Sequence, residues 1–143
     1  MNYKKMMFLE IVIISLFLVL TSCRTIAGQP RIKNAEIIPP ELSPGSSAVI
    51  QVVVKDKHHV VRKVEGVVKE DPRIKLKLRD DGMEPDKKAN DGIWVLKVDV
   101  PTEAVPGKFT LEVDAYNKDG MSVKIRDKGE VFPLHLEIPI IIK

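Results

Sequence analysis

A group of acidic residues between positions 80 and 91 has the types and spacing that could bind a cation. The oxygen-bearing side chains of this segment are Asp80, Asp81, Asp86, Asn90 and Asp91. Carboxylate and amide oxygens are the ligands of Ca²⁺, which takes six to eight of them. The spacing differs from that of the helix–loop–helix calcium loop, and Lys87 and Lys88 would repel a cation. Calcium binding is therefore one of two interpretations of this segment.

The other interpretation, which we favour, is a metal-free turn. Asp and Asn side chains accept hydrogen bonds from backbone N–H groups two residues further on, which is why they are common in turns. Gly82 and Gly92 lie in the same segment, and glycine adopts the positive φ values that tight turns need. We therefore predict no metal site here, and a calcium site built from the four aspartates is the alternative.

The three histidines offer little for catalysis or metal binding. His58 and His59 are adjacent, so on a strand their side chains would point to opposite faces and could not chelate one ion. We expect them in a turn between Asp56 and Val60. His135 has no obvious partner, and no serine stands in a nucleophile-elbow pattern. We predict that the chain is not an enzyme and has no catalytic residue.

The only cysteine of the chain, Cys23, follows an apolar run. Lys4 and Lys5 give the chain a positive start, the residues from 11 to 20 are apolar with one exception, and small residues come next. These are the three parts of a secretory signal peptide. A transmembrane helix needs about 20 apolar residues, and Glu10 limits the run to about half that length. The pattern favours secretion over membrane spanning.

The cleavage region resembles the lipobox of bacterial lipoproteins, in which a Leu and two small residues precede a Cys. Leu20, Thr21, Ser22 and Cys23 match this pattern at all four positions. The resemblance implies that residues 1–22 are a signal peptide that is removed. It also implies that the Cys23 thiol carries a diacylglycerol and that its new amine usually carries a third acyl chain. Each buried CH₂ group contributes about 0.8 kcal/mol, so two or three chains would hold the protein firmly.

The same resemblance predicts where the chain resides. The implied location is the cell envelope, outside the cytoplasm and lipid-anchored. Arg24 is not the aspartate that resembles an inner-membrane retention signal, so the outer membrane is favoured if the organism has two membranes. Residues 23–30 would comprise the lipidated cysteine and a short tether. Seven residues after Cys23 span at most about 23–25 Å, which would keep the following domain close to the bilayer.

Composition limits the domain organisation and the partners. Without residues 1–22 the chain keeps 21 of its 23 basic residues and 19 of its 20 acidic ones. This near balance gives no argument for nucleic acid binding, and secretion argues against it. Residues 31–143 are enough for one ordinary domain. A domain of this size needs no disulfide, and a single cysteine could not supply one.

Strand signals recur from Arg31 to the C-terminus. Apolar and polar residues alternate most clearly in segments 74–79, 94–100, 109–115 and 134–142. No segment has an apolar period of 3.6 residues over a helical length. Pro133 and Pro139 fall inside the last strand, which suggests an edge or a bulge because proline cannot donate a ladder hydrogen bond. Seven or eight short strands separated by turns predict an all-β protein with a single β-sandwich.

Three turn motifs resemble those of bacterial immunoglobulin-like domains. The Asp-Asp-Gly, Pro-Gly-x-aromatic and Asn-x-Asp-Gly patterns lie in segments 78–94, 106–111 and 117–120. Trp94 stands where tyrosine is commoner in that family, and the cysteine pair of antibody domains is absent. The resemblance implies an immunoglobulin-like or fibronectin-III-like β-sandwich over residues 31–143. It is nearly silent about function.

Two further groups of side chains have both a structural and a binding interpretation. Basic residues are frequent between positions 55 and 77, where a solvated strand face is favoured over contact with anionic lipid headgroups or another acidic envelope surface. Trp94, Phe109 and Phe132 are expected in the core rather than on a ligand platform. Few other aromatic residues are present, so a sugar-binding face is disfavoured.

These observations predict a lipid-anchored module of the cell envelope with a binding or structural role, such as an adaptor or subunit at the membrane surface. Its partners would be the membrane, through the lipid anchor, and other envelope proteins, with no nucleic acid. The alternative is a ligand-binding module for calcium, anionic lipid or glycan. No cofactor is expected beyond the covalent lipid on Cys23.

Overall fold

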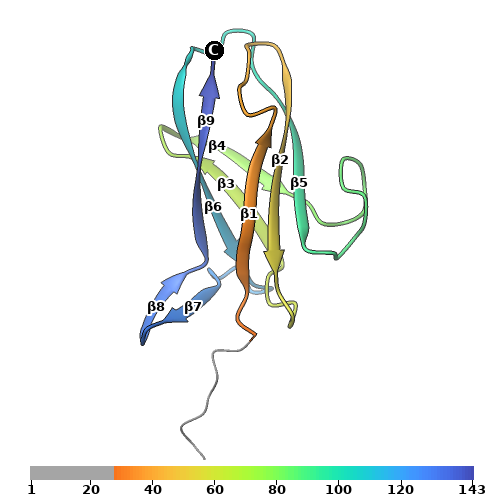
Figure 1. Ribbon diagram of the computed structural model, residues 1–143, viewed down its shortest axis with the longest axis vertical. Coiled ribbons are helices and arrows are strands. Elements are labelled where there is room, and N and C mark those ends of the chain that lie inside the picture. Colours follow the sequence, from red (N-terminus) through yellow and green to blue (C-terminus); the bar gives the residue numbers. More distant parts are fainter. Residues whose placement is uncertain (1–27) are drawn as a thin grey trace, which may run out of the picture.

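The protein is all-β over the part that its structure describes. A computed structural model describes residues 28–143, and the predicted signal peptide and Cys23 lie outside this range. No helix capable of crossing a bilayer occurs between residues 28 and 143. The strands (Figure 1) are β1 (Arg31–Ile38), β2 (Ser47–Lys55), β3 (Lys63–Val68), β4 (Asp71–Leu78), β5 (Ile93–Asp99), β6 (Gly107–Tyr116), β7 (Lys124–Asp127), β8 (Glu130–Pro133) and β9 (His135–Ile142).

Seven of these strands form two antiparallel sheets that lie face to face (Figure 1). One sheet has the strand order β1-β2-β5, and the other has the order β4-β3-β6-β9. This arrangement confirms the expected immunoglobulin-like β-sandwich. β7 and β8 pair with each other in a separate hairpin. The hairpin is inserted between the last two strands of the larger sheet, and the sequence pattern did not separate it from them.

Alternate apolar residues of both sheets fill the space between them. In β2 every second residue from Ala48 to Val54 is buried. Across the core, Leu111, Val113 and Ala115 of β6 have no exposed surface. Burying a Val or Leu side chain stabilises a fold by roughly 1.5–3 kcal/mol. The period of two read from the sequence is therefore the period that builds this core.

Backbone hydrogen bonds close the sandwich along both of its sides. Between the β1–β2 loop and the C-terminal strand, Leu42 N–H donates to the Ile141 carbonyl and Lys143 N–H donates to the Leu42 carbonyl, both at 2.8 Å. On the other side, Arg79 and Val95 exchange two bonds of 2.9 and 2.8 Å. β9 is an edge strand of its sheet, which confirms the expectation drawn from Pro139. The expectation that Pro133 lies in the same strand is wrong, because Pro133 is the last residue of the separate strand β8.

The sandwich has two ends, which we call the tether end and the far end. The tether end comprises residues 28–33, 55–62 and 117–133, and the β4–β5 loop lies beside it, since Val54 N–H donates to the Gly92 carbonyl. β1 begins and β2 finishes there, since Arg31 pairs with Lys55. The β7–β8 hairpin projects from this end, and the C-terminus lies at the far end (Figure 1). The far end also contains the β1–β2 and β5–β6 loops.

The aromatic residues divide between the core and the surface. Trp94 and Phe109 are partly buried and pack against the core, as predicted. The expectation that Phe132 is a core residue is wrong, because its side chain is 44% exposed on β8. The physical reason is that β7 and β8 pair only with each other, so all four residues of β8 are exposed.

Candidate functional site

The loop between β4 and β5 is organised by its aspartates. The Asp80 carboxylate accepts hydrogen bonds from the backbone N–H groups of Asp91, at 3.2 Å, and Gly92, at 3.0 Å. Asp86 is 6% exposed and accepts a bond of 2.6 Å from the N–H of Gly82 and one of 3.2 Å from a second backbone N–H in the loop. These bonds join the two ends of the loop, which is the turn chemistry that the sequence predicts.

The other two aspartates of the loop also have donors. Asp81 accepts a bond of 3.0 Å from the N–H of Met83 and pairs with the Arg79 guanidinium at 2.7 Å. The N–H bond first, and the guanidinium second, hold the pKa of Asp81 below its ordinary value. Asp91 accepts a bond of 2.9 Å from the N–H of Ile93. Every aspartate of the loop therefore already accepts a hydrogen bond from at least one backbone N–H group in or next to the loop.

The glycines of this loop have the conformation expected of them. Gly82 and Gly92 have φ values of +74° and +85°. At Gly92 the chain also passes close to β2, where Val54 N–H donates to the Gly92 carbonyl at 2.8 Å. A Cβ atom on Gly92 would lie 2.5 Å from the Val54 carbonyl oxygen. Both the positive φ and this close approach require glycine at position 92.

The calcium alternative has a geometric basis in three of the four aspartates. Asp80, Asp86 and Asp91 each offer one carboxylate oxygen, and these oxygens lie within 4.8 Å of one another. Asp81 is directed to Arg79 instead. Three carboxylates provide fewer ligands than the six to eight oxygens that Ca²⁺ takes, and the same groups hold the loop backbone. The geometry favours the turn, and the absence of calcium stays a prediction.

A cleft of about 700 Å³ opens beside the acidic loop. Val54, Val61, Leu78 and Trp94 line it, together with charged residues of both signs. Asp56 also lines it: one carboxylate oxygen accepts a bond of 2.7 Å from the Val61 N–H, and the other is buried without a hydrogen-bond partner among the described residues. Sequence reasoning missed this cleft because its walls come from separate segments of the chain.

The adjacent histidines lie in the turn between β2 and β3, as predicted. His59 has a φ of +50°. Within the part of the chain that the structure describes, neither histidine belongs to a group of three potential metal ligands. A Cβ atom on Gly28 would lie 2.9 Å from Nε2 of His58. This turn therefore lies against the beginning of the described chain.

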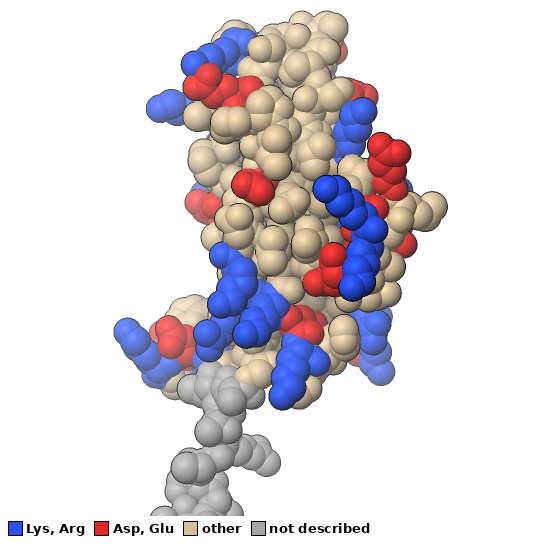
Figure 2. Space-filling model, turned by 45° about the vertical axis from the view of Figure 1, so that its right-hand side comes forward, with Lys and Arg blue, Asp and Glu red and all other residues tan. Residues whose placement is uncertain are grey.

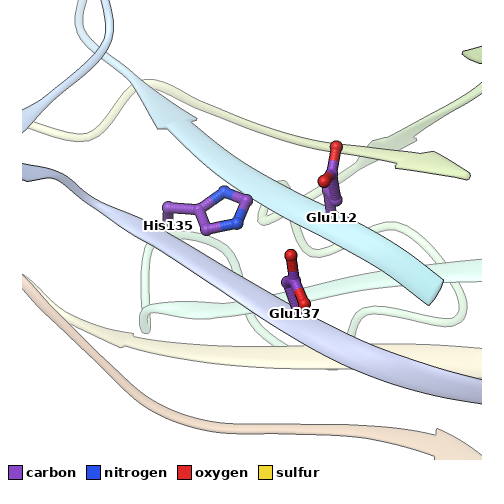
Figure 3. A group of neighbouring side chains, drawn as sticks. All are labelled: Glu112, His135 and Glu137. Carbon is purple, nitrogen blue, oxygen red and sulfur yellow. The ribbon is translucent and has the colours of Figure 1, made fainter. Parts of the chain in front are cut away.

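A second group of potential ligands lies on the four-stranded sheet (Figure 3). Glu112 of β6 pairs with Glu137 of β9, and Asp114 pairs with His135. Ligand atoms of Glu112, His135 and Glu137 lie within 4.8 Å of one another. The expectation that His135 lacks a partner is wrong, because its Nδ1 lies 2.9 Å from the Asp114 carboxylate. The strand register that brings these residues together is not readable from the sequence.

Lys69 supplies a positive charge to this second group. Its Nζ lies 3.0 Å from Glu137 and 3.6 Å from Glu112. The bond to Glu137 and the charges of both glutamates raise the pKa of Lys69. A cationic side chain thus already neutralises the two carboxylates, and we interpret the group as an ion-pair network. Lys69 is exposed in the turn between β3 and β4, which agrees with the solvated surface predicted for the basic residues between positions 55 and 77.

The tether end has a fixed point near the beginning of the described chain. The Gln29 side chain donates a bond of 3.0 Å to the Arg126 carbonyl, and the Arg126 N–H donates one of 2.6 Å back to Gln29 Oε1. The amide therefore pairs with β7 much as a strand residue would. Beside Gly28 and Gln29 lies a hollow of about 260 Å³. Its other lining residues are Arg31, Lys33, Lys55 and Lys57.

Comparisons with known proteins assign no family. No protein-family model and no curated protein matches the chain. A Niemann-Pick type C2 protein from the Japanese carpenter ant has a similar solved structure, with 12% identity and a TM-score of 0.45, covering 80% of this chain and 93% of that one. The alkylpurine DNA glycosylase AlkC of Pseudomonas fluorescens, bound to DNA, matches with 12% identity and a TM-score of 0.39, covering 79% of this chain and 30% of that one. At these scores neither structure informs the function of this chain.

Proposed function

We propose that this chain is a lipid-anchored module of the cell envelope with a binding or structural role, held at a membrane surface through Cys23. The sequence support is the run from Leu20 to Cys23 at the end of the apolar segment. Lipid would occupy the only thiol of the chain, and the aspartates of the β4–β5 loop already serve local donors. We therefore assign the domain no catalytic step, and its partners are the membrane and other envelope proteins.

The observation that carries the proposal is the place of Gly28 in the fold. Gly28 lies at the tether end, and Cys23 precedes it by five residues. Five residues extend at most about 18 Å. A lipid on Cys23 would therefore hold the tether end toward the bilayer and direct the far end away from it.

The far end is then the surface that meets other envelope proteins. Two apolar side chains are exposed there, Val105 in the β5–β6 loop at 71% and Ile38 at the end of β1 at 49%. Exposed apolar side chains are suitable contacts for a protein partner. The proposal thus assigns the two ends different partners, with lipid at one end and protein at the other.

Metabolic labelling with palmitate in a bacterial host tests the anchor. The full-length wild type is expected to incorporate the label and to fractionate with membranes, whereas Cys23→Ser loses both properties. Thr21→Ser keeps a small residue before the cysteine and serves as the matched control, which should be labelled like the wild type. A wild type without label, or a labelled Cys23→Ser variant, would show that Cys23 is not the anchor.

The alternative ligand classes were calcium, glycan and anionic lipid. Anionic lipid has the best structural support, because basic side chains surround the hollow at the tether end. This ligand is compatible with the anchored module and does not compete with it. It concerns the same end of the domain that a lipidated Cys23 would bring to the bilayer.

A further inference from the structure

Basic side chains gather on one side of the tether end. Residues 28–33, 55–62 and 117–133 contain nine Lys and Arg but four Asp and Glu. The β4–β5 loop, which lies beside residues 54–62, contains three basic and five acidic residues. The positive charge therefore lies where the described chain begins and the hairpin projects, away from this loop. Figure 2 shows Lys and Arg side chains gathered where the described chain begins.

Two of these basic residues lie directly opposite each other in a strand pair. Arg31 of β1 is the partner of Lys55 of β2, and like charges at such positions destabilise a sheet. Lys33 and Lys57 add two more cations around the same hollow of about 260 Å³. No acidic side chain lines the hollow among the residues described. Lys55 and Lys57 also line the neighbouring cleft, which contains Asp56, whereas Arg31 and Lys33 do not. An anion in the hollow would supply the counter-charge that the lining of the hollow lacks, and the hollow has room for a phosphate group.

Exposed apolar side chains concentrate at the same end. Eight large apolar side chains are exposed in the described part of the chain, and four of these lie at the tether end: Val60, Met121, Val131 and Phe132. Val131 and Phe132 are neighbours on β8, with 53% and 44% of their surfaces exposed. Adjacent strand residues point to opposite faces. Both faces of the projecting hairpin therefore carry an apolar group.

The β7–β8 hairpin combines these apolar groups with positive charge. Its basic residues are Lys124, Arg126 and Lys128. Basic side chains are attracted to anionic headgroups within a Debye length of a membrane, and aromatic or aliphatic side chains enter the boundary between headgroups and acyl chains. An acidic protein partner would also neutralise these charges, but it would not explain why they lie so close to Cys23. A bilayer satisfies the charge, the apolar groups and the distance together.

We propose that the tether end binds the surface of an anionic bilayer, with headgroup phosphates in the basic hollow and Val131 and Phe132 among the headgroups. The orientation rests on the proposed function, because a lipid on Cys23 keeps Gly28 within about 18 Å of that residue. A covalent anchor raises the effective concentration of the second contact, so the surface itself can be weak. Two contacts would hold the domain in one orientation on the membrane.

The test measures the depth of each end in the lipidated protein, reconstituted into phosphatidylcholine vesicles with or without phosphatidylglycerol. Cys23 is the only cysteine, so in the acylated protein Val131→Cys or Val105→Cys provides a single thiol for a fluorophore. In anionic vesicles, spin-labelled lipid should quench the fluorophore at position 131 and leave that at position 105, at the far end, unquenched. Added salt should reduce the quenching because it screens the headgroup attraction.

Two pairs of charge reversals distinguish binding at the hollow from a general effect of net charge. Lys33→Glu with Lys57→Glu removes two cations of the hollow, whereas Lys97→Glu with Lys108→Glu makes the same change in net charge at exposed positions elsewhere. The first pair should abolish the quenching at position 131, and the second pair should preserve it. Equal quenching in neutral and anionic vesicles, or equal losses in both pairs, would overturn the proposal.

The mass of the N-terminal peptide of the purified protein measures acylation independently of docking. An unmodified Cys23 would refute the lipid anchor, and the same protein would still test the surface by sedimentation with the two kinds of vesicle. An acylated protein whose position 131 is never quenched would refute the docking surface alone.

Discussion

The side-chain amide of Gln29 is hydrogen-bonded to the main chain of Arg126 in both directions, at 3.0 and 2.6 Å, across 97 positions of sequence. The pair joins the beginning of the described chain to β7. It therefore fixes the hairpin relative to the point where the chain enters the sandwich. Each such bond replaces bonds to water, so its net contribution to stability is about 0.5–1.5 kcal/mol.

Replacing Gln29 should loosen the hairpin without unfolding the sandwich. We expect Gln29→Ala to accelerate hydrogen exchange at the Arg126 amide, while the free energy of unfolding falls by no more than about 3 kcal/mol for the two bonds. Gln51→Ala is the matched control, because the Gln51 side chain bonds to Glu36 in the sandwich. Unchanged exchange at Arg126 in Gln29→Ala would mean that the amide pair does not hold β7.

Two aromatic residues should differ in their effect on stability according to their burial. Trp94 packs against the core, so Trp94→Ala should cost about 2–4 kcal/mol, near the range for truncating a core aromatic. Phe132 is exposed on the hairpin, so Phe132→Ala should cost less than about 0.5 kcal/mol. Urea denaturation of both variants measures the difference. A loss below about 1 kcal/mol for Trp94→Ala would place its ring outside the core and favour a role as a ligand platform in the cleft.

A comparison of two glycines with similar φ values distinguishes backbone strain from a steric clash with a neighbouring strand. Gly92 and Gly120 have φ values of +85° and +75°, but only Gly92 has an atom, the Val54 oxygen, within contact distance of an added Cβ. Gly120→Ala should therefore cost about 1–2 kcal/mol for its left-handed backbone. Gly92→Ala should cost at least about 1 kcal/mol more, because β2 or the loop must shift. Thermal melts that show equal losses would exclude the contact with β2.

Local patterns in the sequence were sufficient to predict the sandwich and its turns. Alternation of apolar residues located β5, β6 and β9, because one face of each strand is buried against the other sheet. Turn chemistry located the loop from Asp80 to Gly92, where the side chains of Asp81, Asp86 and Asp91 bond to backbone groups two to four positions away. The bonds from Asp91 and Gly92 to Asp80 span eleven and twelve positions, and the sequence did not indicate them. The alternation and the short-range turn bonds depend on neighbours in sequence, and they could therefore be read before the structure was known.

The features that were missed depend on which strands pair and in which register. Phe132 alternates with other apolar residues, but its strand joins a hairpin instead of a sheet. His135 faces Asp114 only because of the register between β6 and β9. The basic hollow combines segments that are far apart in sequence. A single sequence contains no direct signal of these pairings.

Calcium should leave the thermal stability unchanged. The aspartates of the β4–β5 loop already accept hydrogen bonds from the loop backbone, so neither EDTA nor millimolar calcium should shift the melting temperature. A site with micromolar affinity would stabilise the fold by about 4 kcal/mol at millimolar calcium. A calcium-dependent shift that disappears in Asp86→Asn, whose side chain keeps its size, would establish a site at Asp80, Asp86 and Asp91.

Acid should destabilise the fold through carboxylates whose pKa values are lowered. The pKa of Asp81 is lowered by the Met83 N–H and then by Arg79, that of Asp71 by Arg73, and that of Glu70 by the Thr110 N–H. A lowered pKa means that the unfolded chain binds protons first as the pH falls through the ordinary values of 4.5 for Glu and 3.8 for Asp. Stability is then lost below about pH 4.5.

The urea midpoint between pH 7 and pH 3 measures this loss, which should be modest because the three carboxylates are solvent-exposed. Asp71→Asn removes one of them and should make the decrease smaller. A midpoint that is constant over this range would contradict the lowered pKa values.

Under the proposed lipid anchor, many copies of the chain would share one membrane, and the two outer strands of the four-stranded sheet would affect whether these copies associate. Molecules confined to a plane meet more often than molecules in solution. An exposed strand edge can then pair with the edge of a second copy and lead to polymerisation. β9 has Pro139 in its edge, which offers no N–H to a neighbour, and β4 carries Pro72, Arg73, Lys75 and Lys77 along the other edge. Repulsion between the cations on β4 should keep neighbouring copies apart at that edge. At the other edge, Pro139 of β9 offers no N–H donor for pairing, so copies should stay separate even where they are crowded.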